Sequence, residues 1–249
     1  MSDVQQQPSA PGLREPLLTV TVATLLAAAL AVTGRVIPIV GRYLHAEIAA
    51  IFLYAPSLAA RLSGRPFDYR DAGLRLDPLR LNLRVLAVAL AVTFPLFAIG
   101  FFVFYGAVCG PHGGPFTAMF STLCPRWLGL GGGSLRLPPD FLTSALNQLV
   151  VVAIPEELFF RGYLTARLEE RWPPARRWLG APVGKALVVS SLLFALGHVI
   201  VVPNPQRLAV FFPALIFGWM RARTGSIIPG AAFHALCNLF ADVLHTSYF

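Results

Sequence analysis

Seven apolar stretches follow one another along this chain, and most have the length of a membrane-spanning helix. They cover residues 17–33, 36–60, 85–108, 141–164, 186–203, 208–222 and 226–245. About 20 apolar residues in a helix cross the ~30 Å hydrocarbon core of a bilayer. Charged residues make up only 13% of the chain, against about 25% in an ordinary soluble domain. We therefore predict an all-α, polytopic bundle of about seven transmembrane helices.

Three regions are expected along the chain. Residues 1–16 are polar and contain three prolines, which is typical of a disordered tail. Residues 17–140 supply the N-terminal membrane helices and a long outer loop. Residues 141–249 form a catalytic membrane helix core, so called for the polar motifs described below. The first apolar stretch exceeds the roughly 7–15 residues of a signal peptide, so we expect it to remain in the protein.

The positions of the basic residues predict an orientation. Fourteen of the twenty Lys and Arg residues lie in the N-terminal tail or in alternate loops on the same side of the bundle as that tail. The opposite side holds four, namely Arg35, Arg126, Arg136 and Arg207. Because Lys and Arg are enriched in cytoplasmic loops, we predict a cytoplasmic N-terminus and an outer C-terminus.

The loop 109–140 would then face an oxidising periplasm. It is rich in Gly and contains Cys109 and Cys124. These two residues either form a disulfide or remain unpaired thiols at a helix end. The third cysteine, Cys237, is expected to pack away from the polar residues of its helix. None of the cysteines has metal-ligand spacing, so a metal cluster is not expected.

Three polar motifs interrupt the apolar stretches of the C-terminal core. They are Glu156-Glu157-x-x-x-Arg161, Phe194-x-x-x-His198 and His234-x-x-x-Asn238. A charge at the centre of a membrane helix costs about 2.5–3.5 kcal/mol on insertion scales, and unpaired polar groups are also unfavourable there. We therefore expect these side chains to converge in the interior of the bundle.

The spacing within the first motif separates two roles. Glu157 and Arg161 are four residues apart, so they share a helix face and can form an ion pair. Glu156 is turned about 100° away from Glu157 and is free for another partner. Burial raises the pKa of a carboxyl group, which would suit Glu156 as the base that activates a water molecule. Pro155 is expected to bend the helix next to it.

The other two motifs could complete a hydrolytic site. His198 comes from a different helix and could help Glu156 to activate one water. His234 and Asn238 are four residues apart, so both could donate hydrogen bonds to a developing negative oxygen. In the second stretch, His45 and Glu47 are expected near a kink or a water pocket.

At these residues the chain resembles the CPBP family of intramembrane glutamic endopeptidases, which includes the CAAX prenyl proteases. That family has the same three motifs in the same order, and the resemblance covers about residues 141–245. It implies that Glu156 and His198 activate water, that His234 and Asn238 form the oxyanion site, and that Glu157 and Arg161 support it. It implies an endopeptidase that needs no cofactor and acts on membrane-associated or lipid-anchored proteins.

Other interpretations remain open. The charged cluster could be a structural ion-pair network, and each histidine alone could be a hydrogen-bonded core residue. The whole chain could be a proton-coupled transporter, or a noncatalytic scaffold or immunity protein. A zinc metalloprotease would be a fourth class, but the His-Glu-x-x-His motif is missing.

The net charge and the amino-acid usage of the chain add two expectations. The net charge of +8 is spread over short loops, so nucleic-acid binding is not expected. Arg-rich, Lys-poor usage with abundant Ala, Pro, Leu and Gly is typical of a bacterium with a GC-rich genome. We therefore expect a multi-pass protein of the bacterial inner membrane, for example a sorting protease of the myxosortase type.

Overall fold

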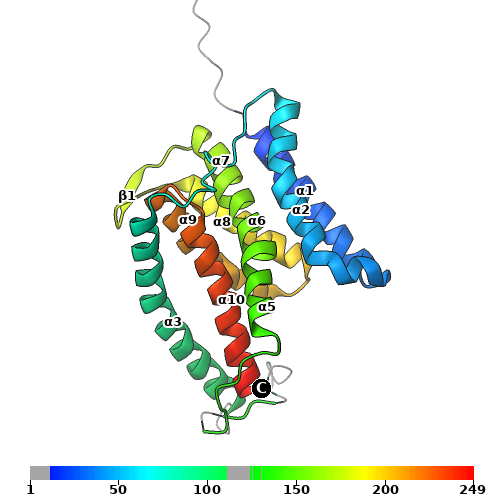
Figure 1. Cartoon of the computed structure of the whole chain (residues 1–249), viewed down its shortest axis with the longest axis vertical. Helices are drawn as coiled ribbons and strands as arrows, with labels where there is room; N and C mark the ends of the chain where they lie inside the picture. Colours follow the sequence, from blue (N-terminus) through cyan, green and yellow to red (C-terminus); the bar gives the residue numbers. More distant parts are fainter. Residues whose placement is uncertain (1–11, 111–123, 125, 130) are drawn as a thin grey trace, which may run out of the picture.

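The computed structural model of the protein describes residues 12–110, 124, 126–129 and 131–249 (Figure 1). Helices predominate among these residues. In chain order the elements are α1 (Arg14–Thr33), α2 (Pro38–Ser63), α3 (Leu79–Cys109), α5 (Phe141–Asn147), η2 (Gln148–Ala153), α6 (Ile154–Glu157), η3 (Leu158–Leu164), α7 (Thr165–Arg171), β1 (Arg176–Trp178), β2 (Ala181–Val183), α8 (Lys185–Val201), η4 (Pro205–Val210), α9 (Phe211–Thr224) and α10 (Ile228–Tyr248).

The N-terminal helices lie on opposite flanks of the molecule. Figure 1 shows α1 and α2 side by side on one flank and α3 on the other. The turn between α1 and α2 is tight, because a Cβ on Gly41 would stand only 2.5 Å from the carbonyl oxygen of Gly34. Helix α1 begins at Arg14, so the last residues of the expected tail are helical. Residues 1–11 of that tail and 111–123 of the expected loop lie outside the described residues.

Within the part of the chain that the structure describes, three helices, α1, α2 and α3, are long and apolar enough to cross a membrane. Their apolar side chains are largely exposed, as at Leu25, Leu58 and Leu96, which suits contact with lipid. The other predicted stretches are also helical, but α8 and α9 are shorter, and the helix from Phe141 alternates between α-helical and π-helical segments. The chain is therefore a mostly helical membrane protein. The number of spans and their orientation stay predictions.

The segment from Phe141 to Arg171 is one continuous rod with two π-helical turns. Segment η2 precedes Pro155 and segment η3 follows Glu157, so wide turns flank the Pro155-Glu156-Glu157 sequence on both sides. Such turns are rare and are frequent at functional sites. The helix is therefore wound more widely on both sides of Pro155. The sequence alone predicts a bend next to this residue.

A β-hairpin corrects the all-α prediction. Strands β1 and β2 pair antiparallel through a two-residue turn, Leu179-Gly180. Both turn residues have positive φ, 48° and 78°, which is the conformation that two-residue hairpin turns prefer. The indole of Trp219 on α9 donates to the carbonyl of Trp178, so the hairpin is fastened to the helical core. The fold is mostly helical with this small sheet.

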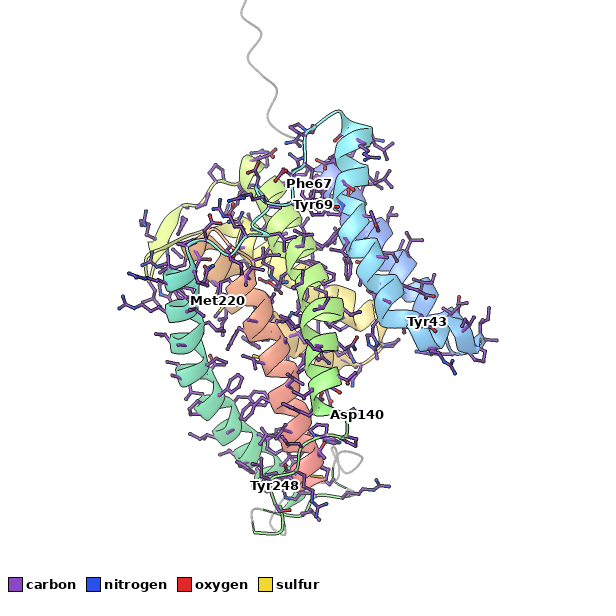
Figure 2. All side chains as sticks on the ribbon, in the orientation of Figure 1. Tyr43, Phe67, Tyr69, Asp140, Met220 and Tyr248 are labelled. Carbon is purple, nitrogen blue, oxygen red and sulfur yellow. A yellow bond between two sulfur atoms is a disulfide. The ribbon has the colours of Figure 1, made fainter. Side chains whose placement is uncertain are left out.

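The connections α2–α3, α7–α8 and α9–α10 meet at one end of the molecule (Figure 1). The amide of Ile227 donates to the carbonyl of Gly73, and Ser226 Oγ donates to the carbonyl of Arg75. Together with the adjoining helix ends, these connections carry thirteen of the twenty Lys and Arg residues. The buried Met220 and the aromatic residues Phe67 and Tyr69 lie toward this end, whereas Tyr248 marks the opposite end (Figure 2).

The opposite end is closed by aromatic contacts and a disulfide. The rings of Phe101, Tyr105, Trp127 and Tyr248 pack together, which joins the end of α3 to the end of α10. The structure joins Cys109 and Cys124 by a disulfide that closes a loop with a sequence separation of 15. Aromatic rings of this kind are common at the two surfaces of a bilayer.

Candidate active site

Side chains of the three sequence motifs line one cavity of about 420 Å³. The cavity lies among α1, α2, the rod 141–171, α8, η4, α9 and α10. Its walls include all four residues predicted for catalysis, Glu156, His198, His234 and Asn238. They come from three helices that are far apart in sequence.

The π-helical turns explain how one helix presents a straight row of residues to this cavity. Gln148, Val152, Glu156 and Phe160 all line it, at spacings of four. In a regular helix of about 3.6 residues per turn, each step of four drifts by about 40°, or about 120° over the row. A π turn bonds i to i+5 and so rotates less per residue, which offsets this drift. The two π segments therefore keep the row facing the cavity.

Glu157 and Arg161 form a buried ion pair, as their spacing predicts. Glu157 Oε1 lies 3.1 Å from Arg161 Nη1, and each side chain is 1% exposed. Arg161 Nη2 also donates to the carbonyl of Ala214, 3.3 Å away. The guanidinium carbon lies 4.3 Å from the ring centroid of Phe194 and 5.2 Å from that of Phe217. The positive charge is thus held by a carboxylate, a carbonyl and aromatic faces.

His234 lies between the two glutamates, a contact that the sequence did not reveal. Its Nδ1 is 3.2 Å from Glu157 Oε1, and its Nε2 is 3.8 Å from Glu156 Oε2. The ring also stacks on Phe217, with centroids 4.8 Å apart and planes 14° apart. An ionised carboxylate only accepts hydrogen bonds, so Glu157 fixes the proton on Nδ1. Glu157 therefore links Arg161 to His234 across two helices.

Glu156 presents a carboxylate oxygen to the cavity. Its Oε2 is buried and, among the described residues, has no hydrogen-bond partner. A buried carboxylate oxygen normally accepts hydrogen bonds, so an unpaired one in a cavity is typical of a functional group. The side chain is 14% exposed, enough to meet a water or a substrate that enters the cavity.

The tautomer of His198 follows from a hydrogen bond within its own helix. Nδ1 lies 2.9 Å from the carbonyl oxygen of Phe194, one turn earlier on α8. A carbonyl can only accept, so Nδ1 carries the proton. In the neutral ring, the lone pair on Nε2 is then available to accept a proton from water.

Asn238 is held by a residue outside the three motifs. Its Nδ2 donates to Gln148 Oε1 over 2.9 Å, and both side chains line the cavity. No sequence motif marks Gln148, because its position opposite α10 depends on the π turn that follows it. A polar residue in an otherwise apolar stretch was the only available signal.

Four further polar residues line the same cavity, namely Thr24, His45, Arg207 and Asp242. His45, expected near a kink or a water pocket, lines this cavity, whereas Glu47 is not among the lining residues. Cys237 packs against the cluster of Phe217 and Phe233, as expected, but it also lines the cavity, so it does not lie away from the site. The cavity extends past Asn238 along α10, since Ala241 and Asp242 line it as well.

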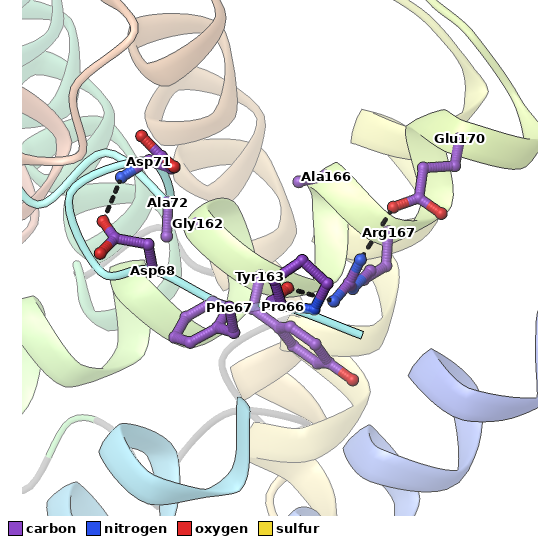
Figure 3. A pocket seen from close by; sticks show the side chains of 10 residues that line it. All are labelled: Pro66, Phe67, Asp68, Asp71, Ala72, Gly162, Tyr163, Ala166, Arg167 and Glu170. Carbon is purple, nitrogen blue, oxygen red and sulfur yellow. Dashed lines mark hydrogen bonds and ion pairs between the residues drawn. The ribbon is translucent and has the colours of Figure 1, made fainter. Parts of the chain in front are cut away.

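A second cavity, of about 220 Å³, lies near the end where the basic loops meet (Figure 3). It is lined by the loop 66–72 and by the helix 162–170, with Tyr163, Arg167 and Glu170 among its residues. It contains none of the predicted catalytic residues. Beside it, an ion-pair network joins Glu15 and Arg65 to Arg167 and Glu170, which fastens α1 to the core.

This network predicts a measurable dependence of stability on pH. Burial alone would raise the pKa of Glu170, but hydrogen bonds from Arg65 and Arg167 outweigh it and lower the pKa from its ordinary 4.5. The ionised group therefore stabilises the fold above that value, and the contribution is lost as the pH falls through the lowered pKa. We expect Glu170→Gln to unfold at a lower temperature than the wild type at neutral pH, because its free energy of unfolding falls by less than about 1 kcal/mol. In acid this difference should disappear.

Glu169 provides a control of opposite sign for this thermal-unfolding series in detergent. Burial raises its pKa, so its ionisation at neutral pH opposes folding. Glu169→Gln should leave the neutral protein equally or more stable. A destabilisation by Glu170→Gln that persisted unchanged in acid would contradict the assigned ion pairs.

Among the described residues, no group of three or more His, Cys, Asp or Glu side chains has the geometry to hold a metal ion. The donors nearest one another are the two glutamates and His234, and Glu157 is already paired with Arg161. The arrangement is that of carboxylate and imidazole groups around a cavity, which can move protons to and from water.

Comparison with known proteins found one family whose model matches this region. Residues 138–240 match the model of the Rce1-like family, described as type II CAAX prenyl endopeptidase Rce1-like. The match includes the three motifs and Gln148 but covers less than half of the chain. Searches of curated proteins and of solved structures found no match. The family match confirms the predicted resemblance to CAAX-type proteases.

Proposed function

We propose that the chain is a glutamic-type intramembrane endopeptidase, on the premise that residues 138–240 match the model of the Rce1-like family of type II CAAX prenyl endopeptidases. One observation supports this proposal most. A single cavity contains Glu156 with an unpaired carboxylate oxygen, His198 with a fixed tautomer, and two potential hydrogen-bond donors, His234 and Asn238. Water activation and oxyanion stabilisation would then occur in one space.

The proposed reaction begins with a water molecule between Glu156 and His198. Glu156 takes a proton from the water as its oxygen attacks the carbonyl carbon of the substrate. His198 accepts a hydrogen bond from the same water through Nε2 and so orients it. The carbonyl oxygen becomes negative, and the C–N bond then breaks as the proton on Glu156 passes to the leaving amine. The immediate products are a carboxylic acid and an amine, and at neutral pH the proton of the acid passes to the amine, which leaves a carboxylate and an ammonium group.

Asn238 and His234 would stabilise the negative oxygen. Asn238 has a second N–H besides the one that it donates to Gln148. His234 donates from Nδ1 to Glu157, so it can donate from Nε2 to the oxyanion only in its doubly protonated form. Loss of one oxyanion donor typically costs about 100- to 1,000-fold in rate. Glu157 and Arg161 act indirectly, by holding His234 in place.

The substrate would be a membrane-associated or membrane-anchored protein. The cavity borders α1 and α2, two of the apolar helices, so a chain anchored in lipid could reach it without crossing water. We propose the bacterial inner membrane as the location, and a sorting role that trims membrane anchors as the biological task. Comparison of membrane proteomes from cells with wild-type or Glu156→Ala protein would identify cleaved proteins, and unchanged termini throughout would count against a protease.

The other functional classes fit the observations less well. A proton-coupled transporter would use the same residue types, but the family match is to endopeptidases. A scaffold or immunity protein would not need Glu156, His198, His234 and Asn238 to share one cavity. Neither alternative predicts any proteolysis.

A metal-free mechanism makes a separate prediction. Carboxylate and imidazole groups suffice to activate water, so we expect cleavage by the purified protein in detergent to survive EDTA and ortho-phenanthroline. Added zinc should not increase the rate. A thermolysin control in the same detergent should lose activity in the chelator. Stoichiometric zinc in the active protein, with activity lost on stripping and restored on re-addition, would instead indicate a metalloprotease.

A further inference from the structure

Gln148 occupies a position that the proposed mechanism leaves unexplained. It is a neutral amide in an apolar stretch, eight residues before Glu156, and it lines the same cavity. Its Oε1 accepts a hydrogen bond of 2.9 Å from Asn238 Nδ2 across the gap between η2 and α10. In a membrane helix an amide side chain needs such a partner, because an unpaired one is unfavourable.

This contact restricts the orientation of the Asn238 amide. An Asn side chain alone can turn about its last torsion, so either its oxygen or its nitrogen could face the cavity. The bond to Gln148 directs the nitrogen toward η2 and uses one of its two N–H groups. The second N–H is left to donate to a negative oxygen in the cavity. The side-chain carbonyl of Asn238 then does not face that oxygen, so it does not repel it.

We propose that Gln148 is a positioning residue for the oxyanion site: it holds the Asn238 amide in the orientation that donates to the tetrahedral intermediate. This inference rests on the proposed function of Asn238. Gln148 itself touches neither the water nor the scissile bond. The π turn η2 is the structural device, because it brings Gln148 onto the same face of the rod as Glu156.

The test compares Gln148→Met with Asn147→Leu in detergent. Met has the length of Gln but only a weak acceptor, so it leaves the Asn238 amide free to turn. The probes are two quenched peptides, one ending in farnesyl-cysteine plus three residues and one carrying a C-terminal transmembrane anchor. We expect Gln148→Met to lower kcat about 10- to 100-fold with little change in KM, since misplacement of a group by about 1 Å can cost 100-fold.

Asn147→Leu serves as the matched control. Asn147 is the preceding residue, also an amide, but it is exposed and does not line the cavity. Its replacement should leave kcat and KM near the wild-type values. If Gln148→Met does not fold, Gln148→Asn replaces it. That variant keeps the amide and shortens the side chain by one methylene, which moves the acceptor out of reach.

A double-mutant cycle separates positioning from a merely structural role. If Gln148 acts through Asn238, then Gln148→Met in the Asn238→Ala background should lower kcat by less than about threefold further. If the decreases in kcat of the two single variants multiply in the double variant, or if KM rises at constant kcat, Gln148 does not act through Asn238. Either result would overturn this inference but leave the proposed protease function intact. If the wild type cleaves neither peptide, the proposed function fails. In that case the hydrogen bond between Gln148 and Asn238 has only a structural role. Non-additive changes in the unfolding temperatures of the Gln148 and Asn238 variants would not alter this conclusion.

Discussion

Glu156→Gln should abolish cleavage while the protein stays folded. The amide has the shape of the carboxylate but cannot take a proton from water, so the attacking nucleophile is not formed. Folding should survive, because Glu156 Oε2 has no hydrogen-bond partner among the described residues and the Glu157–Arg161 pair is untouched. The measurement is single-turnover cleavage of either peptide probe, together with thermal unfolding in detergent. We expect a rate at least about 1,000-fold below the wild type, given that general acid–base catalysis contributes about 100- to 10,000-fold.

Glu169→Gln is the matched control for this variant. It makes the same chemical change on the same helical rod, at a position that does not line the main cavity. It should retain wild-type kcat. Cleavage by Glu156→Gln at a wild-type rate would remove the proposed base, and loss of activity in both variants would point to a general effect of the substitution on the rod.

Arg161→Met should cause the largest loss of stability. The guanidinium is buried against Phe194 and pairs with Glu157, which also accepts from His234. Without it, Glu157 would keep a buried charge whose remaining partner is His234. Removing one partner of a buried ion pair typically costs about 3–5 kcal/mol. We expect a markedly lower unfolding temperature in detergent and a loss of activity that accompanies it.

Two comparison variants define what this loss means. Arg171→Met changes an exposed arginine of the same rod and should have an effect within about 0.5 kcal/mol. Glu157→Gln combined with Arg161→Met removes both charges, so it should be more stable than Arg161→Met alone. A double variant less stable than either single variant would show that the aromatic and carbonyl contacts of Arg161, rather than its charge, hold the helices together.

The sequence was sufficient to find the four proposed catalytic residues that the cavity brings together. Glu156, His198, His234 and Asn238 stand out because polar groups in apolar helices are costly and require partners. The Glu157–Arg161 pair is equally visible, because side chains four residues apart on a helix always share a face. Membrane-length apolar stretches likewise indicate a mostly helical protein. These are local properties, and local properties can be read from the order of residues.

Contacts between distant segments depended on the tertiary structure. Spacing could not show that Glu157 also binds His234, since that contact joins helices 77 residues apart in sequence. Gln148 reaches the cavity because of the π-helical segments of its helix, and Cys237 reaches it because of the packing of α10. No residue pattern predicts a π turn. The hairpin 176–183 was missed because its turn, Leu179-Gly180, lies in a short basic loop. Local residue types determined which groups need partners, and the packing of the helices decided which partners they meet. The reason is that a difference of a few degrees of rotation per residue adds up along a helix, so that later side chains point from a different face.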